Sequence, residues 1–302
     1  MSRVLMTLCT LLFLIGARAE AQDLRVVYLD GTLQIRQGSG WRALRIGEPV
    51  PADVSLQLAK GSVAELAGRV AGGEELRVTL TQPGSYSVAA LFKASREAAS
   101  WGFGRLLAAK LRAFFAAPGA RSPTAMGARA GEAESEIGME WADEEQDAAR
   151  KGRQLLEQGR FEEAVDSFQE ALAVADAQMR PYYLFLIGTA WSLAGRNAQA
   201  LQALEQAQPP QTAPYFADYA LLKGRVLLEA QSYAQALALF DALLASPAPL
   251  DRDAAQPAWF LSAFCSLQLG DASQARERLL KARSLGSDTD FGRQATELLN
   301  NQ

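Results

Sequence analysis

The chain of 302 residues contains no histidine. This absence excludes Ser-His-Asp and Cys-His catalysis, zinc sites built on imidazole, and pH switching by histidine. The sequence also lacks a Gly-x-Ser-x-Gly elbow, a Ser-x-x-Lys motif and a glycine-rich phosphate loop before a helix. We therefore expect a protein that is not an enzyme and that has no catalytic, metal-binding or cofactor-binding residues.

Cysteine is nearly as scarce, because the chain has only Cys9 and Cys265. Cys9 lies in an apolar run near the N-terminus with no acylation motif around it, so a lipoprotein is not expected. If that run is removed, Cys265 is the only cysteine left and an internal disulfide is excluded. Cys265 falls in an apolar stretch, where a free cysteine is usually buried. The alternative is a thiol that pairs with another molecule.

The N-terminus has no apolar run long enough to span a membrane. Residues 1–19 and the two residues after them combine a basic start at Arg3, a mainly apolar run of twelve residues at 4–15 and small residues at Ala17, Ala19 and Ala21. A membrane-spanning helix needs roughly 20 apolar residues. The pattern predicts a cleaved signal peptide and a periplasmic location. The alternative is an uncleaved segment that anchors the protein in the membrane.

Positive charge is in short supply. The chain has 30 basic and 34 acidic residues, a net charge of −4 that becomes about −6 if Arg3 and Arg18 leave with the signal peptide. Nucleic-acid binding requires a basic surface. No nucleic-acid partner is therefore expected.

Residues 23–90 have the pattern of a small β domain. Short alternating or β-branched runs are separated by glycine-rich turns such as Asp30-Gly31. This spacing predicts an antiparallel sandwich or barrel, so that the whole chain is α+β in separate domains. The expected strands are 24–29, 32–36, 41–46, 54–58, 63–68, 75–80 and 85–88.

The same segment resembles the FecR-like domain. The resemblance rests on Gly-Thr-Leu-Gln-Ile at 31–35, on Gly-x-Gly-Trp-Arg-Ala-Leu-Arg-Ile-Gly-Glu-Pro-Val at 38–50, and on Lys-Gly-Ser-Val-Ala-Glu-Leu at 60–66. It implies a module of envelope regulators that several bacterial groups join to tetratricopeptide repeats in exported proteins. It implies no catalytic residue. The turn glycines are also what any hairpin of a β fold requires.

Two segments separate this domain from the rest of the chain. In 91–117, apolar residues recur every three to four positions between Phe103 and Phe114, which predicts an amphipathic helix. It either contacts an anionic membrane or packs against the protein. Residues 118–143 read as a flexible acidic linker. Its glutamates lack the spacing of a calcium loop, and its Trp141 is a candidate to cover the open end of the first repeat.

Residues 144–302 repeat themselves. Four similar blocks carry an alanine at the sixth position, at 36, 36 and 39 residue intervals: Ala164, Ala200, Ala236 and Ala275. Such a period indicates four stacked helical hairpins, and residues 288–299 are expected to form a capping helix. The longer third interval, with Pro247, Pro249 and Pro257 in the connector, predicts a tilted or loosely stacked fourth hairpin.

The blocks resemble tetratricopeptide repeats. Small residues at Gly152, Gly188, Gly224 and Ala263 precede each turn, and unit one continues with Phe161, Ala164, Phe168 and Ala171. The resemblance implies a concave groove, lined by the first helix of each hairpin, that binds a protein or peptide. The inward positions are Arg153, Leu156, Tyr182, Phe185, Thr189, Ser192, Asp218, Leu221, Arg225, Leu228, Phe260, Phe264 and Gln268.

These features indicate an exported interaction scaffold or adaptor of the cell envelope. Arg153 and Arg225 are candidates to pair with a carboxylate of the ligand. An accessory or regulatory subunit of an envelope enzyme or signalling system, with the β domain as its sensing module, is the alternative. A structural subunit of a larger envelope complex would have the same sequence features.

Overall fold

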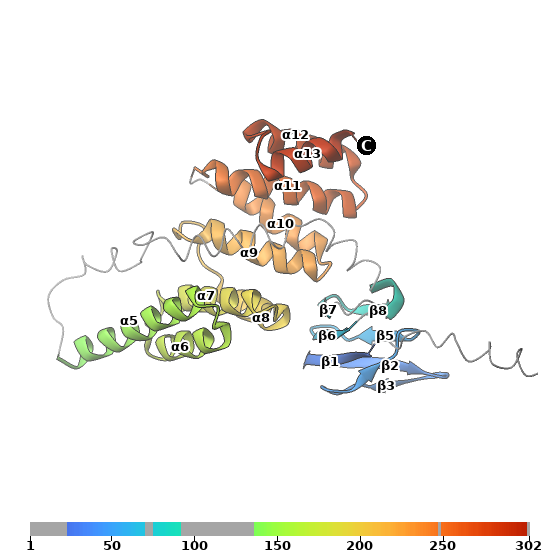
Figure 1. Ribbon diagram of the computed structural model, residues 1–302, viewed down its shortest axis with the longest axis horizontal. Coiled ribbons are helices and arrows are strands. Elements are labelled where there is room, and N and C mark those ends of the chain that lie inside the picture. The colour runs from blue at the N-terminus through green and yellow to red at the C-terminus, as the bar shows by residue number, and fades with distance from the viewer. Residues whose placement is uncertain (1–22, 70–74, 92–135, 247–248, 301–302) are drawn as a thin grey trace, which may run out of the picture. The chain divides into compact units, whose positions relative to one another are not determined.

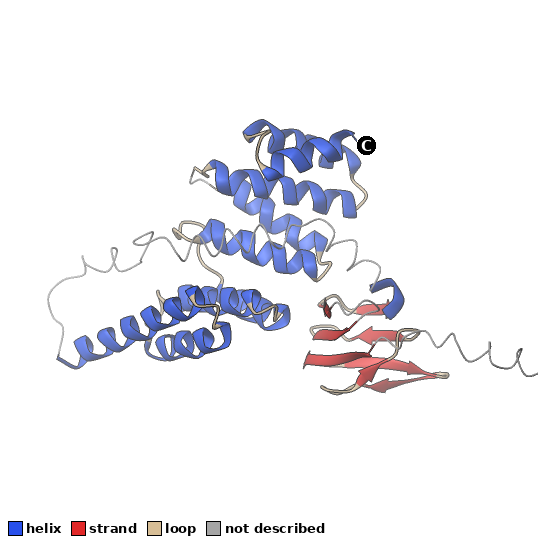
Figure 2. Ribbon diagram, in the orientation of Figure 1, coloured by secondary structure: helices blue, strands red, loops and turns tan. Residues whose placement is uncertain are grey.

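The computed structural model describes residues 23–69, 75–91, 136–246 and 249–300. The chain forms two compact units, residues 1–98 and 99–302. In the part of the chain described, strands occur only in the first unit, and the second is helical (Figures 1 and 2). The predicted signal peptide, nearly all of the amphipathic helix and the first part of the linker lie outside the described residues.

The first unit contains two four-stranded antiparallel sheets (Figure 1). Their orders are β4-β1-β6-β7 and β3-β2-β5-β8, and no strand pair joins one sheet to the other among the described residues. The predicted sandwich is therefore observed, and the barrel is not closed. The strands are β1 (Asp23–Asp30), β2 (Leu33–Gln37), β3 (Gly40–Ala43), β4 (Pro49–Val50), β5 (Ser55–Leu58), β6 (Val63–Arg69), β7 (Glu75–Leu80) and β8 (Gly84–Ser87).

Alternation along the strands produces the core of this unit. Leu33 and Ile35 of β2 are buried together with Leu56 and Leu58 of β5, whereas the residues between them point away from the core. Every predicted strand is present, but β3 ends at Ala43, three residues before the expected end. The two-residue β4 falls in a segment that the sequence pattern assigned to a turn.

From residue 136 onward, the described part of the second unit forms four helical hairpins followed by a single helix (Figure 1). Helix α5 begins at Glu136, inside the segment expected to be a linker, and the side chains are described from residue 145 onward. The helices are α5 (Glu136–Glu157), α6 (Phe161–Val174), α7 (Arg180–Leu193), α8 (Asn197–Ala207), α9 (Phe216–Glu229), α10 (Tyr233–Leu244), α11 (Arg252–Gln268), α12 (Ala272–Leu285) and α13 (Asp290–Asn300).

Small residues on the first helix of a hairpin allow the second helix to approach closely. A Cβ atom at Gly152 would lie 2.5 Å from the Phe168 ring, and one at Gly188 would lie 2.6 Å from Leu204 Cγ. Both distances are too short for real carbon atoms. A larger side chain at either position would therefore force the two helices of the hairpin apart.

The hairpin turns require left-handed backbone. Gly159, Gly195 and Gly270 adopt φ of 75°, 71° and 83°, a region that glycine enters without a steric penalty. In the third hairpin the same position holds Gln231, with φ 55°. This hairpin therefore forms its turn with a residue that is poorly suited to it.

The fourth hairpin packs against the third in spite of the longer interval between them. Pro257 lies inside α11, which begins five residues earlier with Asp251 as its N-cap, so Pro257 is not part of the connector. Tyr233 of α10 makes an edge-on contact with Phe264 of α11, with ring centroids 6.2 Å apart. The expectation of loose stacking was wrong, because the connector places α11 against α10 in spite of its extra length. Helix α13 buries Phe291 and Ala295 against the last hairpin, as expected of a cap.

Candidate functional site

The predicted groove residues on the first helices of the hairpins are mostly inside the protein. Phe185 and Thr189 are fully buried, and seven other members of the predicted set are nearly so. Arg153, Asp218 and Phe264 are half-buried, and Gln268 is exposed. The buried members are Leu156, Tyr182, Phe185, Thr189, Ser192, Leu221, Arg225, Leu228 and Phe260.

Aromatic packing between neighbouring hairpins explains this burial. Tyr215, just before α9, stacks on Phe185 of α7 with ring centroids 5.4 Å apart and an interplanar angle of 18°. It also meets Tyr182 edge-on at 5.0 Å. The repeat pattern does not predict a role for Tyr215, because this residue lies outside the repeated blocks. The available signal was a single tyrosine at the end of a proline-rich connector, directly before α9.

Arg225 does not present a free guanidinium to a groove. Its Nη1 donates to Glu229 Oε1 at 2.5 Å and its Nη2 donates to Ser192 Oγ, within a side chain that is only 7% exposed. Glu229 also accepts a hydrogen bond from Asn197 at the start of α8. The expectation that Arg225 binds a ligand carboxylate is corrected, since its terminal nitrogens already have partners within the stack.

The accessible members lie along the first helices. Arg153 on α5 is half-buried beside the phenol groups of Tyr182 and Tyr183. Burial raises the pKa of Tyr182, and the nearby Arg153 partly opposes this shift. Phe264 and Gln268 lie on α11, one helical turn apart. This side of the stack therefore offers a cationic group at one end and an aromatic and an amide group at the other.

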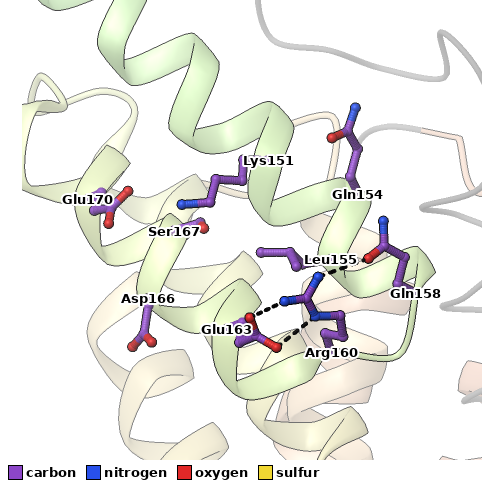
Figure 3. A pocket seen from close by; sticks show the side chains of 9 residues that line it. All are labelled: Lys151, Gln154, Leu155, Gln158, Arg160, Glu163, Asp166, Ser167 and Glu170. Atoms are coloured by element: carbon purple, nitrogen blue, oxygen red, sulfur yellow. Dashed lines mark hydrogen bonds and ion pairs between the residues drawn. The ribbon is translucent and has the colours of Figure 1, made fainter.

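A polar pocket of about 410 Å³ lies between α5 and α6 (Figure 3). Arg160 Nε donates to Glu163 Oε1 at 2.7 Å, and this contact holds the pKa of Glu163 below its usual range. Lys151 extends toward Ser167 in Figure 3. The pocket is lined by Lys151, Gln154, Leu155, Gln158, Arg160, Glu163, Asp166, Ser167 and Glu170.

The position of this pocket accounts for its polarity. Helix α5 is the first helix of the stack in the part of the chain that the structure describes. One repeat later, Lys151, Gln154 and Ser167 are replaced by Ile187, Ala190 and Ala203, which are all buried. Terminal repeats of a solenoid need a polar outer face. The pocket is therefore a polar end of the stack in the described residues, which the repeat pattern did not predict.

The described residues show no arrangement suited to metal binding. They contain no group of three or more Cys, Asp or Glu side chains that could hold a metal ion. Cys265 is buried, as expected, and burial raises the pKa of its thiol to about 12, so that it is protonated and unreactive at neutral pH. In the same residues, no helix is both long and apolar enough to cross a membrane.

The stacked hairpins define the second unit as a helical-repeat module. Its residues 150–215 match the family model of the tetratricopeptide repeat, so this segment carries repeats of that type. No curated protein matches the chain.

Several solved structures are similar to about half of the chain. MamA residues 41-end from Desulfovibrio magneticus RS-1 is 21% identical, with 53% of this chain and 93% of that chain covered and a TM-score of 0.43. Pseudomonas aeruginosa PilF is 19% identical, with 51% and 66% covered and a TM-score of 0.42. YrrB, described as a repeat protein with an unusual peptide-binding site, is 18% identical, with 48% and 71% covered and a TM-score of 0.41. Likeness of this size carries no information on what this chain binds.

Proposed function

We propose that the chain is an exported, non-enzymatic scaffold or adaptor of the bacterial cell envelope. Its helical repeats bind a polypeptide, and its β unit is a separate FecR-like module. The observation that carries the proposal is the repeat stack itself, in which residues 150–215 match the tetratricopeptide repeat and each hairpin packs against the next through α6 with α7, α8 with α9 and α10 with α11. Extended helical surfaces of this kind suit binding of a peptide or protein segment.

The binding surface is the accessible part of that side. Arg153 is placed to pair with a carboxylate, and Phe264 and Gln268 offer an apolar anchor and hydrogen bonds to a peptide backbone. The buried aromatic residues behind them fix the helices and do not contact the ligand. Specificity for the ligand therefore comes from a few accessible side chains that rigidly packed helices hold in place.

Binding is tested with peptides selected from a random display library on the full chain. Affinities of the selected peptides are then measured for Arg153→Glu, Gln268→Ala and a control, Arg276→Glu, on the exposed side of α12. We expect Arg153→Glu to weaken binding about tenfold or more, corresponding to about 1.4 kcal/mol, and the control to change it less than twofold. Selected peptides that bind all variants equally would refute the proposed surface.

Export is tested separately by expression in a Gram-negative bacterium and fractionation. Cleavage after Ala19 or Ala21 and release with the periplasmic fraction are expected. An intact N-terminus in the membrane fraction would instead support the anchored alternative. An uncleaved protein in the cytoplasm would contradict export altogether.

A further inference from the structure

The two sheets of the β unit differ on the sides that face away from their shared core. On the sheet β4-β1-β6-β7, Glu65 and Thr79 point away from the core and are nevertheless buried. On the sheet β3-β2-β5-β8, the corresponding side chains are exposed or half-buried. We call this second surface the open face; it carries Trp41, Arg36, Gln34, Gln57, Ser85 and Ser87.

Strand register places these side chains together. Trp41 is opposite Arg36, and Gln57 lies between Gln34 on one neighbour and Ser85 on the other. Directly opposite residues of antiparallel strands share one face and have Cβ atoms about 5 Å apart. The open face therefore has an aromatic and a cationic group at one edge and a row of amide and hydroxyl groups across its middle.

The chemistry of the open face is unusual for this chain. None of its four strands contains an acidic residue, although acidic residues outnumber basic ones in the chain as a whole. Trp41 is 40% exposed. Among the described residues, the Arg36 side chain has no ion pair with a carboxylate. The open face therefore presents the exposed indole ring of Trp41 next to the Arg36 guanidinium, which no carboxylate of the described residues neutralises.

We propose that the open face binds an acidic polysaccharide. The face of an indole ring is electron-rich and attracts the electropositive C–H groups on the flat side of a sugar ring. The Arg36 guanidinium matches a sugar carboxylate with two parallel hydrogen bonds. Gln34, Gln57 and Ser85 donate to and accept from the hydroxyl groups of following sugars. The absence of carboxylates removes repulsion of an anionic chain.

A polypeptide fits the same surface less well. An acidic peptide would also neutralise Arg36, and its backbone could hydrogen-bond to the row, but its charged side chains have no flat face of C–H groups to lie against Trp41. A glycan presents such a face, and hydroxyl groups that donate and accept, at every sugar. The exposed Trp41 ring and the uncharged middle of the open face therefore favour a glycan over an acidic peptide.

Calorimetric titration of the full chain with hexagalacturonate tests the proposal, with hexaglutamate as a probe of equal length and charge type. Trp41→Ala and Arg36→Gln should each weaken binding of the sugar about tenfold. The matched control is Arg42→Gln, since Arg42 lies on the same strand as Trp41, points to the other side and is paired with Glu48 at 2.8 Å.

We expect the control to bind hexagalacturonate within twofold of the unmodified protein and hexaglutamate to bind at least tenfold more weakly than the sugar. Three outcomes would overturn the proposal. These are no measurable binding of hexagalacturonate, equal binding of hexaglutamate, which would indicate a surface for acidic polypeptides, and an equal loss in Arg42→Gln. Circular dichroism and unfolding midpoints of the variants confirm that the fold is kept.

Discussion

Gly224 on α9 lies against the ring of Phe240 on α10, so closely that a Cβ atom at residue 224 would be 2.3 Å from Phe240 Cε1. Phe240 is fully buried, and because protein interiors are close-packed its ring cannot move aside without displacing its neighbours. Gly224→Ala should gain about 1 kcal/mol in helix propensity and lose more through overpacking. We expect the free energy of unfolding to fall by about 1–2 kcal/mol, measured by urea denaturation.

A second substitution separates overpacking from other causes. In a Phe240→Ala background no ring meets the new methyl group, so Gly224→Ala should cost at least about 1 kcal/mol less than in the unmodified protein. An identical cost in both backgrounds would show that the Phe240 ring is not what excludes the methyl group.

A substitution in the turn of the third hairpin should make the protein more stable. Gln231 adopts φ 55°, where a side chain costs about 1 kcal/mol and glycine does not. Gln231→Gly should raise the free energy of unfolding by about 0.5–1 kcal/mol, and Gly195→Gln, with φ 71°, should lower it by about 1 kcal/mol. Thermal unfolding of both variants checks the pair. A destabilised Gln231→Gly would mean that the glutamine side chain contributes a contact that offsets its strain.

Burial of Cys265 makes stability depend on pH in the alkaline range. The pKa of the Cys265 thiol is raised to about 12 in the folded protein, whereas a thiol in an unfolded chain has a pKa of about 8.5. Above the unfolded pKa, the unfolded chain loses this proton and the folded protein keeps it, so stability falls as pH rises toward the folded pKa. The free energy of unfolding of Cys265→Ala should therefore decline less steeply than that of the unmodified protein between about pH 9 and 12. Urea titrations at several pH values in this range measure the difference. Rapid labelling of the native protein by a thiol reagent at pH 8 would contradict burial.

Much of the fold follows from periodicity and turn chemistry. The hairpins were predictable because Gly152 and Phe168, and their equivalents, recur with the repeat and have a direct steric meaning. Strands were predictable from alternation between glycine-rich turns. The short β4 and the start of α11 before Pro257 were not, since each depends on a tertiary neighbour or on a cap such as Asp251.

The candidate site was less predictable than the fold. The predicted groove residues lie on the first helices of the hairpins, but their exposure depends on what the next hairpin places over them. Tyr215, in a connector outside the repeat, covers Tyr182 and Phe185. Likewise, Arg225 is engaged by Ser192, one repeat earlier in the chain. Repeat spacing identifies equivalent positions and does not reveal such contacts between units.

A substitution of Arg225 tests whether this residue stabilises the stack of hairpins or binds the ligand. Arg225→Glu would place a carboxylate next to Glu229 and remove the hydrogen bond to Ser192, in a side chain that is almost wholly buried. Breaking a buried charge pair costs about 3–5 kcal/mol, and the half-buried position of Glu229 favours the lower end of that range. We expect a loss of about 3 kcal/mol in urea denaturation, against less than about 0.5 kcal/mol for Arg276→Glu. If Arg225→Glu instead kept full stability and lost peptide binding, Arg225 would be a ligand-binding residue after all.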